Sequence, residues 1–152
     1  MKRFRFSLRP VAILRAHQEL KAREAFAASV QAFVKSEQEL ALTRERVRLL
    51  EGELTAERQQ RFSGVDVAKA LAAYRRECVA ETEAEQAMIA AQNTMQQRRM
   101  EYVEAHRRLE VVRRLEEKAR ATHRYEVAHE EQAEFDDFAS RRFAARRSLN
   151  SA

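Results

Sequence analysis

Glycine and proline are nearly absent from this sequence. Among 152 residues there are two glycines, Gly52 and Gly64, and one proline, Pro10. A compact domain built from many short elements needs many turns, and turns depend on these residue types. Their scarcity excludes such a fold and predicts long, uninterrupted helices.

Cysteine and long apolar runs are scarce as well. The single Cys78 excludes a disulfide within the chain and fits a reducing compartment. No apolar run approaches the roughly 18 residues that a membrane-spanning helix needs. The first residues are basic, but Arg9, Pro10 and Arg15 interrupt the apolar run that a signal peptide would need. We therefore expect a cytoplasmic protein.

Motifs that would indicate catalysis are missing too. There is no phosphate-binding loop, no dinucleotide fingerprint, no nucleophile elbow and no paired-cysteine metal spacing. Glu126 and His129 form one E-x-x-H motif, but di-iron bundles need two such motifs and further glutamates. Cys78 is interpreted as a packing residue. The sequence predicts no enzyme, no metal, no cofactor and no small-molecule substrate.

What the sequence does contain is a regular repeat of apolar residues among many charges. Charged residues make up 35% of the chain, and both signs are interspersed, as on the solvated faces of long helices. A first helix is predicted over about residues 10–61, with Pro10 in its first turn. The apolar residues that recur in it every seven positions, as in a coiled-coil seam, are Phe26, Phe33, Leu40, Val47 and Leu54.

A second helix is predicted over about residues 67–147. Its seven-residue repeat is interrupted once, by Glu81, and we expect Val112, Leu115 and Ala119 to continue it with a shift of phase. The residues on the repeat are Tyr74, Met88, Met95, Tyr102 and Leu109.

The break between the two helices, at about residues 62–66, is predicted to be the tip of a hairpin. Gly64 permits the backbone angles of a sharp turn, and Asp66 can cap the second helix. Folding there places residue i opposite about residue 128 − i, so the two seams coincide. The sequence thus predicts an all-α antiparallel coiled coil in a single domain, 1–152. The expected facing pairs are Leu54 with Tyr74, Leu40 with Met88, Phe33 with Met95, Phe26 with Tyr102, and the mismatched Val47 with Glu81.

This register leaves residues 119–147 without a partner inside the chain, as an overhang of the second helix. The charged residues of segment 126–137 are all acidic, whereas the charged residues among 1–23, at the same end, are basic except for Glu19. The phenylalanines of the overhang either close a local bundle with residues 1–9 or contact a partner. From Phe135 onwards, the basic and aromatic residues of the overhang are Phe135, Phe138, Arg141, Arg142, Phe143, Arg146 and Arg147.

Several classes of non-enzymatic protein remain open. One alternative is a generic coiled-coil scaffold or adaptor that dimerises through its overhang. A nucleic-acid-binding helical protein is a further alternative, but it is disfavoured. The reason is that the acidic segment 126–137 adjoins the arginines and would repel a phosphate backbone.

Both ends of the sequence resemble one known family. The stretch FRFSLRPVAILRAHQELKAREAF is similar to the F-x-F-x-L-x-x-V-L-x-x-R opening of the flagellar export protein FliJ family, which has counterparts in virulence type III secretion. The stretch EEQAEFDDFASRRFAARR resembles the ending of that family. The matching residues are Glu131, Gln132, Asp136, Asp137, Ala139, Arg142 and Phe143.

The resemblance implies a stalk-like, non-enzymatic component of a type III protein export apparatus. In this family, the end that carries both termini binds the hexameric export ATPase and regulates it. The protein would act in the cytoplasm, peripherally at the inner-membrane export apparatus. The residues expected to contact the ATPase ring are Phe4, Phe6, Leu8, Arg141, Arg142, Phe143, Arg146 and Arg147.

The resemblance also implies partners at the hairpin tip. There, members of the family contact the membrane protein of the export gate and escort export chaperones with their substrates. No nucleic acid is expected as a partner. The residues expected to contact the gate are Phe62, Val65, Val67, Leu71 and Tyr74.

Overall fold

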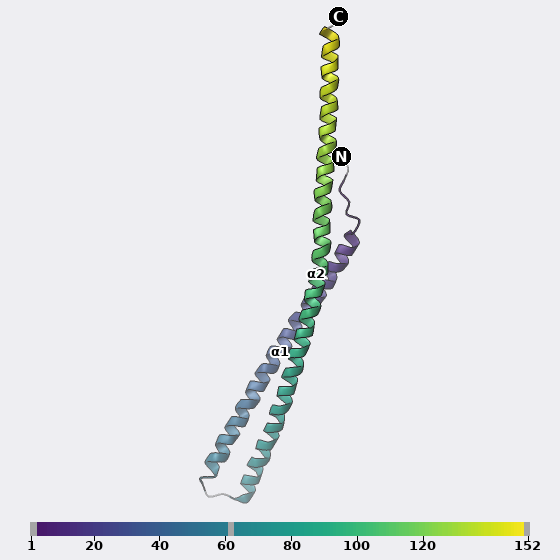
Figure 1. Ribbon diagram of the computed structural model, residues 1–152. Coiled ribbons are helices and arrows are strands. Elements are labelled where there is room, and N and C mark those ends of the chain that lie inside the picture. Colours follow the sequence, from purple (N-terminus) through teal and green to yellow (C-terminus); the bar gives the residue numbers. More distant parts are fainter. Residues whose placement is uncertain (1–2, 61–62, 151–152) are drawn as a thin grey trace. The chain divides into compact units, whose positions relative to one another are not determined.

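The computed structural model describes residues 3–60 and 63–150. Helix α1 spans Arg9–Glu57 and helix α2 spans Gly64–Asn150, and the described residues contain no strand (Figure 1). The two long helices pack against each other, which confirms the all-α hairpin and its overhanging second helix. The chain divides into two compact units. We call Glu19–Ala105 the hairpin unit, and Met1–Gln18 with His106–Ala152 the terminal unit.

In the hairpin unit, α1 contributes two columns of residues to the interface with α2. The predicted column from Phe26 to Leu54 is buried or half-buried throughout. The second column lies three residues later and is largely polar, which the sequence analysis missed. Because the Ser29 and Ser36 hydroxyls donate to backbone carbonyls of their own helix, at 2.6 and 2.7 Å, they need no partner across the interface. The members of the second column are Ser29, Ser36, Thr43, Leu50 and Glu57.

Contacts between the helices of the hairpin unit agree with the predicted register. The rings of Phe26 and Tyr102 stack with centroids 6.1 Å apart, as the pairing of these residues predicts. Val47 is buried at 8% exposure, and its mismatched partner Glu81 instead reaches Arg44, with 3.3 Å between the carboxylate and Arg44 Nε. The polar residue in the seam is thus accommodated by an ion pair at the rim.

In the terminal unit, the seven-residue repeat of α2 continues without a change of phase. Leu109 and Val112 are buried, and Ala119 and His123 are half-buried. All four lie on the two columns of the same seven-residue repeat. Leu115 is 45% exposed and lies outside the seam, so the predicted phase shift is wrong. The apolar character of Leu115 suggested the shift, but the seam position belongs to its neighbour Glu116, which is half-buried.

The connection between the helices differs in detail from the prediction. Helix α1 ends at Glu57, and α2 begins at Gly64, ahead of Asp66. The Ser63 carbonyl accepts hydrogen bonds from the backbone N–H groups of Asp66, at 3.1 Å, and Val67, at 3.4 Å. No glycine has a positive φ, so Gly64 is an ordinary first helical residue and does not supply a special turn conformation.

Candidate partner-binding surfaces

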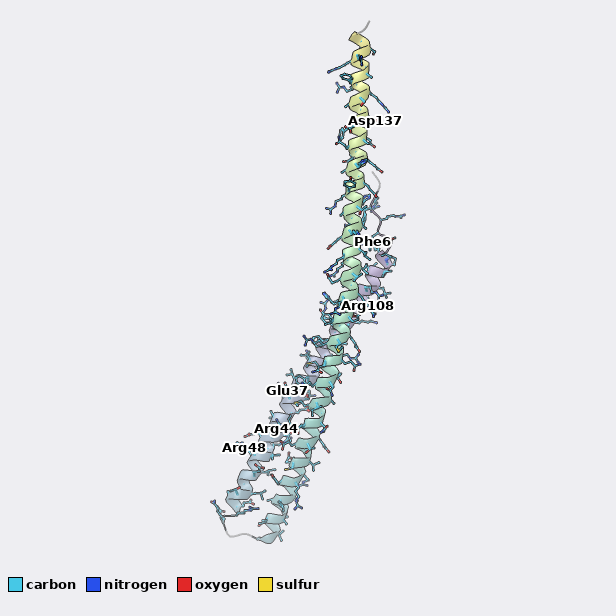
Figure 2. All side chains as sticks on the ribbon, viewed as in Figure 1. Phe6, Glu37, Arg44, Arg48, Arg108 and Asp137 are labelled. Atoms are coloured by element: carbon cyan, nitrogen blue, oxygen red, sulfur yellow. The ribbon has the colours of Figure 1, made fainter. Side chains whose placement is uncertain are left out.

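The N-terminal segment, residues 3–8, is held against α2 by an aromatic residue. The ring centroid of Phe4 lies 5.5 Å from that of His123, and the guanidinium carbon of Arg120 lies 5.1 Å from the Phe4 centroid. Such a cation over a ring is attractive. Phe6, labelled in Figure 2, is half-buried like Phe4, whereas Leu8 is 39% exposed. Phe4 is therefore an anchor of this segment.

A shallow depression surrounds Phe4 on the surface of the terminal unit. Its charged lining is mostly basic, with Glu126 as the acidic member. A smaller hollow beside it is lined by Phe4, Arg120, His123 and Arg124. The residues that line the larger depression are Arg3, Phe4, Arg5, Leu115, Lys118, Ala119, Thr122, His123 and Glu126.

The overhang, which we now define as residues 128–149, exposes every one of its side chains. It begins later than the predicted residue 119, because the N-terminal segment covers α2 near His123 and Val127 is still half-buried. The phenylalanines of the overhang form no local bundle with residues 3–9, the described part of that segment, because all three are at least 60% exposed. Figure 2 marks Asp137 in this part of α2. The large exposed apolar residues are Phe135 at 70%, Phe138 at 60%, Phe143 at 71% and Leu149 at 78%.

These four residues, which we call the aromatic stripe, share one side of α2. At about 100° per residue they fall within a sector roughly 140° wide. The seam that packs against α1 follows another side, roughly 120° away by the same geometry. Beyond Val127 the seam positions carry charged residues such as Glu134 and Asp137. The aromatic stripe is therefore a separate surface and not an extension of the intrachain seam.

Polar contacts in the overhang connect residues of the predicted C-terminal motif. The Gln132 side-chain amide donates to Asp136 Oδ1 at 3.0 Å, one turn later on the same helix. The guanidinium carbon of Arg142 lies 5.8 Å from the ring centroid of Phe138. Both contacts lie along the helix, so they stabilise the overhang locally and leave the aromatic stripe accessible.

The residues predicted at the tip divide into two groups. Val65, Val67 and Leu71 are exposed, at 62%, 38% and 37%, whereas Phe62 lies outside the described residues. Tyr74 is half-buried, and its hydroxyl donates to a carboxylate oxygen of Glu51 at 2.8 Å across the two helices.

The pKa of Tyr74 is raised to about 12. The main cause is the hydrogen bond to Glu51, and the neighbouring thiol of Cys78 is the second. Tyr74 thus joins the helices in the structure and is less available to a partner than the three aliphatic residues.

A ladder of ion pairs beside the seam was not predicted. Arg44 lies 3.3 Å from Glu81 and 3.9 Å from Glu85, and Arg46 lies 3.3 Å from Glu77. Figure 2 shows Arg44 on α1. The sequence did contain a signal for these ion pairs, because residues of opposite charge flank the two heptad repeats. Exposed ion pairs of this kind each add at most about 1 kcal/mol to the free energy of unfolding. Their main effect is therefore to favour this alignment of the two helices over others.

Within residues 3–60 and 63–150, no helix is long and apolar enough to cross a membrane. No group of three or more His, Cys, Asp or Glu side chains is arranged to hold a metal ion in that same part of the chain.

Comparison with known families identifies the chain. The family model described as "Flagellar FliJ protein" matches residues 4–148, which cover all but one residue of the N-terminal segment and all but one residue of the overhang. The chain belongs to the FliJ family. FliJ proteins are non-catalytic components of flagellar type III export. Neither the curated proteins nor the solved structures gave a significant match to this FliJ chain.

Proposed function

We propose that this FliJ chain binds the hexameric export ATPase through its terminal unit and regulates ATP hydrolysis. The observation that carries the proposal is the overhang, where a continuous helix exposes three phenylalanines together with its arginines. An isolated helix with an uncovered apolar side is marginal in water. A protein partner that covers the aromatic stripe would stabilise it.

Within this proposal the N-terminal and C-terminal residues have different roles. Phe4 is engaged with His123 and Arg120, so it positions the N-terminal segment, while Phe6 and Leu8 present the surface of that segment. In the overhang, Phe143 supplies apolar contact. The arginines steer the approach to the ring and set its orientation, as charges at an interface rim do. They are Arg141, Arg142, Arg146 and Arg147.

The tip is proposed to contact the membrane protein of the export gate and the export chaperones. Val65, Val67 and Leu71 are exposed close to the start of α2 and support this role. Such a contact would keep the protein in the cytoplasm and peripherally associated with the inner-membrane apparatus.

The test is ATP hydrolysis by the cognate export ATPase in the presence of this protein. We expect the full-length chain to stimulate hydrolysis and a version that ends at Ala133 to lose the stimulation, because it lacks the entire aromatic stripe. Met100→Ala, at a residue 74% exposed in the hairpin unit, is the matched surface control and should stimulate normally. Equal stimulation by the truncated chain, or none by the full-length chain, would contradict the proposal.

A further inference from the structure

Two copies of the overhang have complementary charge patterns when they lie antiparallel to each other. Acidic residues occupy its first half, up to Asp137, and arginines occupy its second half, from Arg141. A second overhang in the antiparallel direction would place each acidic half opposite a basic half. A parallel copy would instead place like charges opposite each other, which is unfavourable.

The aromatic stripe fits the same orientation. If residue i of one copy lies beside about residue 277 − i of the other, Phe138 and Ala139 lie at the two-fold axis. Phe135 of each copy then lies within about one helical turn of the other copy's Phe143, by the rise of the helix. Isologous pairing of one surface with itself is the usual geometry of a homodimer.

The flanking charges agree with this register. Glu131 lies at the edge of the aromatic stripe by its position on the helix. In the antiparallel pair it faces the turn of the second copy that carries Arg142 and Arg146. The two-fold symmetry repeats this contact, so each dimer gains it twice.

From these observations we propose that the overhang pairs with the overhang of a second copy in an antiparallel homodimer. Each buried aromatic side chain removes about 150–250 Å² from water, so six partly exposed phenylalanines offer on the order of 800 Å². That area falls in the range of weak, transient interfaces. The dimer is therefore concentration-dependent.

One consequence rests on the proposed function. The dimer covers Phe143 and the arginines that are proposed to contact the ATPase ring, so dimerisation and ring binding exclude each other. The dimer would hold the protein away from the ATPase until the ring displaces the second copy.

The first test needs no ATPase and uses sedimentation of the full-length protein over a concentration series. Glu131→Arg in one variant and Arg142→Glu with Arg146→Glu in another each place like charges together, so each variant alone should lose the dimer. An equimolar mixture of the two should recover it as a heterodimer. A native protein that stays monomeric throughout, or a mixture that does not recover the dimer, would overturn the proposal.

A cysteine cross-link tests the register. In a Cys78→Ser background, Ala139→Cys lies near the two-fold axis and should form a disulfide-linked dimer under mild oxidation. Ala128→Cys, on the same side of the helix, should not, because the two copies of residue 128 would lie about 30 Å apart. Cross-linking of Ala128→Cys as readily as Ala139→Cys would refute the antiparallel arrangement.

The cross-linked Ala139→Cys dimer also separates this inference from the proposed function. It should fail to stimulate the ATPase, and reduction of the disulfide should restore stimulation. Stimulation by the covalent dimer would refute the exclusion of ring binding. An absence of stimulation by the native chain as well, together with a dimer that passes the two preceding tests, would refute only the proposed function.

Discussion

The seam of the hairpin unit predicts a large effect of truncation at one leucine of α1 and almost none at another leucine two residues away. Leu40 is 3% exposed, whereas Leu42 is 63% exposed. Truncation of a buried leucine to alanine removes apolar contact and leaves a cavity, at a cost of about 2–5 kcal/mol. Because a two-helix interface relaxes more easily than a thick core, we expect Leu40→Ala to lower the free energy of unfolding by about 2–3 kcal/mol. Leu42→Ala is expected to change it by less than about 0.5 kcal/mol.

The measurement is urea unfolding of each full-length variant, followed by far-ultraviolet circular dichroism. The comparison is internally controlled, since both substitutions have the same chemistry and nearly the same helix propensity. The Leu40 variant should show an earlier midpoint with a similar slope. Equal midpoints for the two variants, or a larger effect at Leu42, would refute the assignment of Leu40 to the seam.

Two further predictions concern the helices themselves. Gly52→Ala should raise the free energy of unfolding by about 0.5–1 kcal/mol, because alanine favours the helix interior and a Cβ at this position meets no atom within 4 Å; an unchanged or lower urea midpoint would contradict this. In a spectrophotometric titration, one phenol should ionise at about pH 12, against an ordinary 10.0, and Tyr74→Phe should remove that step. Since Tyr74 stays protonated in the folded chain while the unfolded phenol ionises, its contribution to stability is present below pH 10 and is lost between pH 10 and about 12.

The sequence predicts the hairpin and its register well, because a seven-residue repeat ties each apolar residue to one side of a helix. The pairing of Phe26 with Tyr102 follows directly from that periodicity. The polar column that contains Ser29 and Thr43 was not predicted, since its hydroxyls bond to the backbone of their own helix and their burial leaves no apolar pattern. The contact of Phe4 with His123 could not be predicted from the seven-residue repeat either, because Phe4 lies in a non-helical segment that has no such period.

The candidate surfaces are harder to derive, because the partners that would cover them are not encoded in the intrachain repeat. The change of phase between the seam and the aromatic stripe is nevertheless visible in the sequence. At the seam positions beyond Val127 the residues become charged, while Phe135 and Phe138 appear on a different side of the helix. Such a shift indicates that the helix changes partner along its length.

The weak seam and the exposed overhang together favour a protein whose terminal unit is completed by binding. No described side chain is fully buried, and the buried apolar residues are few. A helix of the length of the overhang gains little stability without packing on its apolar side. Any partner that covers the aromatic stripe therefore also orders the overhang, and this coupling applies equally to an ATPase ring and to a second copy. Because both would use Phe143 and the adjacent arginines, their competition depends on the concentration of free protein. Export would then be most sensitive to this FliJ chain where the free chain is too dilute to dimerise.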